Sequence, residues 1–198
     1  MVRRTCGPRL TGPTVGLSPL ARNHTLSNMA VFIALLRAVN VGGTGKLPMA
    51  EFKAICEKAG CAKVRTCIAS GNAVFESRRP EAGVKAALEA RLEKYAGKPV
   101  RVLVRTRAEM AAVLKANPFP EAAANRTVAI FLDDPPPVDT IDHIAGRNGE
   151  EVELGQREIY VHYGARMAGS KLKIPAAKAG TARNMNTVAK LIEIANEL

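Results

Sequence analysis

After residue 29, apolar residues recur in short strand-like runs or at helical spacing, which predicts short strands and amphipathic helices. The run VFIALLR at 31–37 is almost continuously apolar and predicts a buried strand. The elements that follow are expected as a helix at 48–60, strands at 63–68 and 72–77, a helix at 78–98 and a strand at 99–105. The order β-α-β-β-α-β predicts a ferredoxin-like sandwich, whose helices cover one face of an antiparallel sheet.

The second half of the chain repeats part of this order. Thr106 and Glu109 have the spacing of a capping box, which predicts the start of a linking helix at 106–117. We then expect a strand at 126–132, a short helix within 135–146, a hairpin at 150–163, a loop at 164–184 and a final helix. This second unit is β-α-β-β-α, one strand short of the first. The predicted fold class is therefore α+β, with antiparallel or mixed sheets.

These patterns divide the chain into four parts. They are a flexible N-terminal extension at 1–28, a ferredoxin-like subdomain at 29–105, a linking helix and loop at 106–126, and a second, incomplete subdomain at 127–198. The extension holds four Arg and no acidic residue, and it lacks the apolar core of a secretory signal. It is either an Arg-rich targeting leader or an upstream extension of a start at Met29, and we favour the second.

Composition predicts a globular protein outside the membrane. Of 198 residues, 47% are hydrophobic, and no apolar run approaches the ~20 residues of a membrane helix. The cysteines Cys6, Cys56, Cys61 and Cys67 lack the spacing of a zinc site, so reduced thiols are expected. We expect a cytoplasmic monomer or homodimer with no metal and no cofactor.

Conventional catalytic sets are hard to find in the sequence. His24, His143 and His162 are not paired by spacing with a Cys, a Ser or a carboxylate. Ser70 and Ser170 remain as candidate nucleophiles, without a base at a suitable spacing. The sequence therefore identifies no reaction.

The stretch RAVNVGGTGKLPM at 37–49 is reminiscent of a phosphate-binding loop. A Walker loop needs Gly where this chain has Asn40, and Ser or Thr where it has Leu47. What remains is a Gly-rich turn between a strand and a helix, whose N–H groups can face an anion beside Lys46. The alternative is a tight turn that needs its glycines only for backbone freedom.

Three motifs, LLRAVNVGG, IASGNAVF and TARNMNTVAKL, together resemble the domain-of-unknown-function 1697 family. Members of that family open with a strand ending in LRGINVGG, carry SGNVVF in the middle and finish with TxRNWNT. The likeness runs from Met29 to the C-terminus, with Ala38 in place of a usual Gly and Met185 in place of a usual Trp. The resemblance implies a fold and a site. It implies no reaction, because the family has no established activity.

Each motif lies in a stretch that has basic residues and no acidic ones, at 31–50, 58–75 and 159–192. Such stretches favour a phosphate or another anion as partner, although surface Lys and Arg are also ordinary solvated charge. The candidate ligand-binding residues are Arg37, Asn40, Gly42, Gly43, Lys46, Ser70, Asn72, Lys171, Arg183, Asn184 and Asn186. For Asn72 and Asn184, a role in a turn or a helix cap is the alternative.

Three classes of function follow from these observations. The first is a binder of a small anionic, phosphate-bearing ligand in a basic cleft formed by the Gly-rich turn, the SGN turn and the RNMN segment. The second is an enzyme that acts on a phosphorylated small molecule or nucleotide, with the loop at 164–180 as a lid. The third is a nucleic-acid binder, given the pI of about 9.9. We rank nucleic acid last because the strands lack the aromatic pattern that stacks bases.

The three motifs are expected to converge on one cleft, since a single negative partner explains three separate acid-free stretches most simply. Arg37 and Arg183 would supply bidentate contacts, with Lys46 and Lys171 as added charges. On this interpretation Arg183→Ala weakens ligand binding by about 1–3 kcal/mol and barely changes stability, as at a solvent-accessible cleft.

Residues 1–28 are expected to make few contacts with the rest of the chain, because their composition cannot offset the entropy lost on ordering. Limited proteolysis should remove them first, and the trimmed protein should melt at an unchanged temperature. A large loss of thermal stability on trimming would contradict this expectation.

Overall fold

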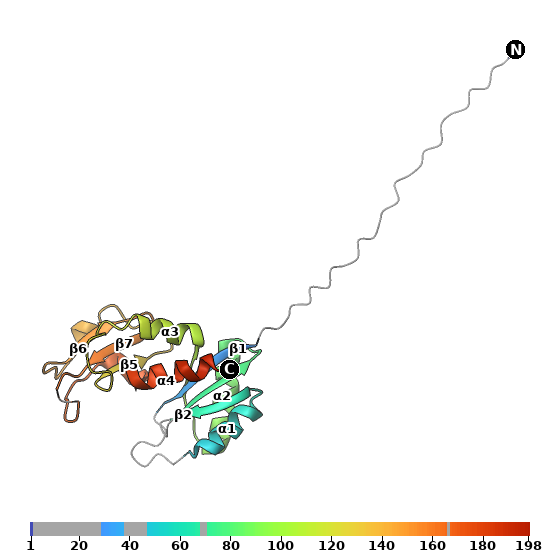
Figure 1. The fold of residues 1–198 in the computed structure, drawn as a ribbon, viewed down its shortest axis with the longest axis horizontal. Coiled ribbons are helices and arrows are strands. Elements are labelled where there is room, and N and C mark those ends of the chain that lie inside the picture. Colours follow the sequence, from blue (N-terminus) through green and yellow to red (C-terminus); the bar gives the residue numbers. More distant parts are fainter. Residues whose placement is uncertain (2–28, 38–46, 68–70, 166) are drawn as a thin grey trace.

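The computed structural model describes Met1 and residues 29–37, 47–67, 71–165 and 167–198. The first unit consists of β1 (Ala30–Leu36), α1 (Met49–Lys58), β2 (Ala62–Cys67), β3 (Asn72–Ser77), α2 (Glu81–Ala96) and β4 (Val102–Thr106). Its strands form one antiparallel sheet in the order β2-β3-β1-β4. The predicted ferredoxin-like sandwich is confirmed for this unit, which lies at one end of the folded body (Figure 1).

Local sequence explains where elements of this unit begin and end. α2 ends at Gly97, whose φ of 68° is the left-handed conformation that closes a helix. The next helix, α3 (Arg107–Lys115), begins at Thr106, whose side chain accepts from the Glu109 amide while the Glu109 carboxylate accepts from the Thr106 amide. The predicted capping box is thus confirmed, and it turns the chain from β4 directly into α3.

The second unit follows α3 and repeats the strand order of the first. It consists of β5 (Thr127–Phe131), η1 (Thr140–His143), β6 (Glu151–Leu154), β7 (Glu158–His162), η2 (Pro175–Ala179) and β8 (Thr181–Asn184), and it is followed by α4 (Met185–Asn196). Its antiparallel sheet has the order β6-β7-β5-β8. Two short 3₁₀ helices, η1 and η2, stand where the first unit has α1 and α2.

The second unit is not one strand short, as the sequence analysis expected. Residues 181–184, which were assigned to a loop, form β8 and pair with β5. Apolar alternation does not reveal this strand, because its buried residues are the polar Thr181 and Arg183 while Ala182 is exposed. The α+β class and the antiparallel sheets are confirmed.

The apolar core is layered. The outer face of the first sheet packs against α1 and α2, and the outer face of the second sheet packs against the segments around η1 and η2. The inner faces of both sheets share one cluster with α3 and α4, which pack against each other (Figure 1). Its members include Ile33, Leu35, Val74 and Leu103 of the first sheet, Met110 and Val113 of α3, Ala129, Phe131 and Tyr160 of the second sheet, and Val188 and Leu191 of α4. Each fully buried apolar side chain of this kind contributes about 1.5–3 kcal/mol, so this shared layer holds the two units together.

Strand pairing aligns the two units residue by residue. Ile33 of β1 lies opposite Arg105 of β4, and Ala129 of β5 lies opposite Arg183 of β8. Each arginine is the residue before the N-cap of the following helix, α3 or α4. The two halves therefore share one plan, in which Arg105 and Arg183 occupy equivalent positions.

Gly180→Ala should destabilise the protein by about 1–3 kcal/mol, because the close approach of η2 to β5 leaves no room for a side chain. A Cβ at Gly180 would lie 2.5 Å from the Phe131 carbonyl oxygen and 2.9 Å from Ile130 Cγ2. Urea unfolding measures the change. The control, Gly83→Ala inside α2, meets nothing nearer than 3.5 Å and should stabilise the helix by about 0.5–1 kcal/mol. Changes of the same sign in both variants would contradict the close approach.

Candidate functional site

The side chain of Arg183 joins the second sheet to the strand ends of the first. Its Nε donates to Asn72 Oδ1 at 2.6 Å and its Nη2 donates to the Leu36 carbonyl at 3.0 Å. Its Nη1 donates to Thr181 Oγ1 at 2.8 Å, and the Thr181 hydroxyl donates to the same Leu36 carbonyl at 3.2 Å. The residues at these strand ends and at the start of α4 are called the Arg183 junction: Leu36, Arg37, Gly71, Asn72, Thr181, Arg183 and Thr187.

Arg183 is buried, with 7% of its surface exposed. Burial lowers the pKa of its guanidinium to about 10, because the charged form loses solvation, yet the group remains cationic at neutral pH. The acceptors at Asn72, Thr181 and Leu36 are neutral oxygens. The structure corrects the expectation that Arg183 lies at a solvent-accessible surface, since its polar atoms connect two sheets.

Parts of all three sequence motifs meet at this junction. The amide of Leu36, at the end of the first motif, donates to the carbonyl of Gly71 in the second motif at 2.8 Å. Arg183 comes from the third. Arg37 follows Leu36 directly, and its Nη2 donates to the carbonyl of Lys178 at the end of η2. The structure therefore brings Arg37 and Arg183 to the same strand end.

The other described candidates have different surroundings. Asn72 also donates from Nδ2 to the Cys67 carbonyl at 3.1 Å, and Asn184 caps α4 by accepting from the Thr187 amide at 2.9 Å. Asn186 is exposed in the first turn of α4. Lys171 lines a separate cavity of about 680 Å³, formed by 146–150, 163–165 and 168–171. Asn40, Gly42, Gly43, Lys46 and Ser70 lie outside the described residues.

Arg105 makes equivalent bonds from the first sheet to the second, whereas those of Arg183 run from the second sheet to the first. Its Nη2 donates to the carbonyl of Leu132, which is three residues beyond Ala129 as Leu36 is three residues beyond Ile33. Its Nη1 donates to the carbonyl of the preceding residue at 2.8 Å, as Arg183 also does. Arg105 is 1% exposed. Two buried arginines thus connect the sheets reciprocally.

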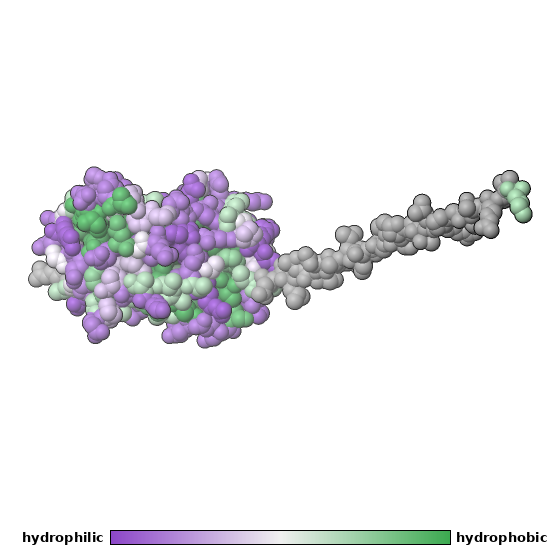
Figure 2. Space-filling view, turned by 90° about the horizontal axis from the view of Figure 1, so that it is seen from above, coloured by the Kyte–Doolittle hydropathy of each residue, from purple (hydrophilic) through white to green (hydrophobic). Residues whose placement is uncertain are grey.

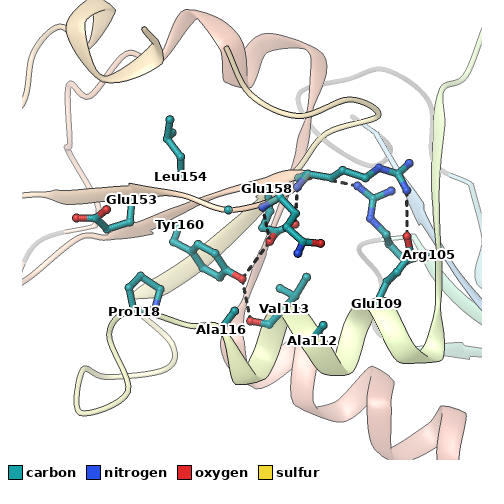
Figure 3. A pocket seen from close by; sticks show the side chains of 13 residues that line it. Arg105, Glu109, Ala112, Val113, Ala116, Pro118, Glu153, Leu154, Glu158 and Tyr160 are labelled. Atoms are coloured by element: carbon teal, nitrogen blue, oxygen red, sulfur yellow. Dashed lines mark hydrogen bonds and ion pairs between the residues drawn. The ribbon is translucent and has the colours of Figure 1, made fainter. Parts of the chain in front are cut away.

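Carboxylates lie near Arg105, and Figure 3 shows two of them, Glu109 and Glu158. The neighbouring Arg157 donates to Glu81 at 2.8 Å and to Glu109 at 3.1 Å, and Glu158 accepts from the Arg157 amide at 3.0 Å. Burial has the largest effect on the pKa of Arg105 and lowers it, and the positive charge of Arg157 lowers it further. The negative charges of Glu109, Glu81 and Glu158 raise it. Charges supplied by the fold itself therefore support this buried cation. Arg105, Glu109, Asp133, Arg157 and Glu158 are called the Arg105 junction.

A cavity of about 370 Å³ lies beside the Arg105 junction, between α3 and the β6–β7 hairpin (Figure 3). The Tyr160 hydroxyl, which donates to the Val113 carbonyl at 2.9 Å, forms part of its wall. Burial raises the pKa of Tyr160, and the negative charge of Glu158 raises it further, so this hydroxyl stays protonated.

Equivalent positions of the two junctions differ in charge. The equivalent pairs, with the residue near Arg105 given first, are Arg105 and Arg183, Asp133 and Arg37, Glu109 and Thr187, Arg157 and Gly71, and Glu158 and Asn72. The Arg105 junction thus has two cations and three carboxylates at these positions, of which the Asp133 carboxylate pairs with Lys85 of α2. The Arg183 junction has two cations and no carboxylate at the same five described positions.

A family model described as "Protein of unknown function (DUF1697)" matches residues 29–160, which is more than half of the chain. The chain belongs to this family. The resemblance inferred from the three motifs is confirmed, although the match ends before β8 and Arg183. No curated protein matches the sequence.

Among solved structures, this DUF1697 protein is similar to "conserved bacterial protein SP0830 from Streptococcus pneumoniae". The TM-score is 0.71 and the sequences are 24% identical, with 85% of this chain and 99% of that chain covered. At this identity the likeness establishes the fold alone, and it covers most of both chains.

Other kinds of site find little support in the described part of this DUF1697 protein. Cys56, Cys61 and Cys67 are buried free thiols, and burial raises the pKa of Cys61 to about 11. Among the described residues, no group of three or more His, Cys, Asp or Glu could hold a metal ion. No described helix is long and apolar enough to cross a membrane.

Sequence reasoning missed Thr181 and the counterpart Arg105. A signal for Arg105 existed, because it ends an apolar strand just before a helix cap, as Arg183 precedes Asn184. Recognising the shared plan of the two halves would have paired the arginines. Thr181 carries no such signal, since its role depends on the distant Leu36 carbonyl.

Arg183→Ala should destabilise the protein by about 2–4 kcal/mol, since it leaves buried acceptors of both sheets without their charged donor. Arg37→Ala removes a side chain that is only partly buried and should cost less than about 1 kcal/mol. Chemical denaturation of both variants measures the two changes. Equal stability losses would contradict the distinction between the two arginines.

Proposed function

We propose that this DUF1697 protein binds a small anionic, phosphate-bearing ligand at the Arg183 junction. The observation that supports this proposal is the difference in charge between the two equivalent junctions. Where the Arg105 junction has Glu158, Asp133 and Glu109, the Arg183 junction has Asn72, Arg37 and Thr187. A bound anion would favour the charged form of Arg183, as nearby carboxylates favour the charged form of Arg105.

The physical reason lies in the cost of burying a guanidinium. Burial disfavours the charged form of Arg183, and a second cation, Arg37, approaches the same strand end. A phosphate close to both would stabilise the two charges at once, and guanidinium groups suit its oxygens geometrically. Binding energy would therefore come from attraction between the ligand and these two cations.

The glycine-rich turn supports the choice of a phosphate over a simple carboxylate. Arg37 leads into the stretch that contains Gly42, Gly43 and Lys46, and Gly71 follows Ser70. Consecutive glycines allow backbone N–H groups to surround a multiply charged oxyanion. That these residues contact the ligand stays a prediction.

Asn72→Asp tests the proposal, because it places a carboxylate where the Arg105 junction has Glu158. The introduced charge would pair with Arg183 and repel an incoming anion, so affinity for inorganic phosphate or a nucleotide should fall about 10–100-fold. Stability should change by less than about 1 kcal/mol, since the new ion pair offsets the lost bond to the Cys67 carbonyl. Calorimetric titration and thermal shift measure the two quantities.

The matched control is Asn196→Asp, which adds the same charge at an exposed position at the end of α4. It should bind the anion as the unaltered chain does. Equal losses in both variants would indicate only a general charge effect, and unchanged binding by Asn72→Asp would overturn the proposed site. A thermal shift with short RNA but not with phosphate or nucleotides would favour the nucleic-acid alternative instead.

A further inference from the structure

The outer faces of the two sheets are covered unequally. In the first unit, α1 and α2 lie over the sheet, with 10 and 16 residues. In the second unit the equivalent elements, η1 and η2, have only 4 and 5 residues. Figure 2 shows apolar side chains gathered on the surface at the end of the molecule that holds this second unit. A thinner cover leaves space next to the outer face of the second sheet.

This space contains a cavity of about 460 Å³. Its wall combines Ile130 of β5 with Leu172 and Ile174 from the segment that leads into η2, and with Ala177 of η2 itself. A volume of this size falls within the range of roughly 300–1,000 Å³ that small-molecule sites occupy. The apolar wall would take an aromatic or aliphatic group.

Cationic side chains accompany the apolar wall. Lys173 and Lys178 both line the cavity and are exposed, and no acidic residue occurs among the described residues that line it. His143 lies at the same cavity, and its Nε2 pairs with Asp139 Oδ2 at 3.1 Å. Two exposed lysines at a cavity with an apolar wall favour a ligand with one anionic group.

The frame of the cavity is fixed by backbone bonds. The Ala145 amide donates to the Lys173 carbonyl at 3.0 Å, and the Lys173 amide donates to the Ala145 carbonyl at 2.8 Å. This isolated bridge holds the segment before η2 against the segment after η1. A preformed frame lowers the entropic cost of binding, because the wall does not have to be ordered by the ligand.

We propose that this cavity binds a small amphipathic anion. Its aromatic or aliphatic body would contact Ile130 and Ile174, and its carboxylate, sulfonate or phosphate would lie near Lys173 and Lys178. The proposal goes beyond the Arg183 junction and does not require an anion there. The two sites are neighbours, since Arg37 donates to the carbonyl of Lys178.

The test uses the full chain with anilinonaphthalene sulfonate, an anionic fluorescent probe, and with its neutral relative phenylnaphthylamine. Ala177→Phe fills the cavity and should weaken binding of both probes at least about tenfold. Ala112→Phe is the matched control, because Ala112 lines the other cavity beside α3. It should leave both affinities unchanged, as judged by fluorescence titration.

A second variant, Lys173→Gln combined with Lys178→Gln, separates charge from shape. It should weaken binding of the anionic probe about tenfold and leave the neutral probe unaffected, and both lysines are exposed, so the fold is kept. Melting temperatures confirm folding of each variant. The proposal is overturned if Ala177→Phe binds the anionic probe normally, if Ala112→Phe reduces it equally, or if the double variant does not discriminate between the probes.

Discussion

The structure depends on two buried guanidinium groups, each of which reaches from one sheet to the end of the central strand of the other. Arg105 donates to Leu132 and Arg183 donates to Leu36. Buried carbonyl groups at strand ends need donors, and leaving them unsatisfied costs free energy. Two charge-assisted bonds meet this need while α3 and α4 fill the space between the inner sheet faces. Polar bonds at the strand ends and apolar packing between the sheets thus act together to fix the two units.

Because the two units share one plan, the same arginine position occurs in two electrostatic environments. Beside Arg105, carboxylates of Glu109, Glu81 and Glu158 oppose the effect of burial. Beside Arg183, the equivalent positions are neutral or basic. The two equivalent arginines therefore differ in the charges that surround them.

The second difference between the units concerns their outer faces. Replacement of two helices by the 3₁₀ helices η1 and η2 gives the second sheet a thinner cover and leaves a cavity that lysines help to line. Both differences lie in the region where Arg37 of the first unit contacts the Lys178 carbonyl of the second.

The sequence alone determined the elements that have a clear apolar period or a local cap, including β1, the capping box at Thr106 and the hairpin of β6 and β7. It also identified the family through three motifs and located the acid-free stretches. Only the tertiary structure decided that residues 181–184 form a strand, that Arg183 is buried, and that Lys171 lies in a different cavity. Apolar periodicity records which side of a local element is buried. A buried polar side chain is explained by its partner instead, and the partner of Arg183 at Leu36 lies 147 residues away.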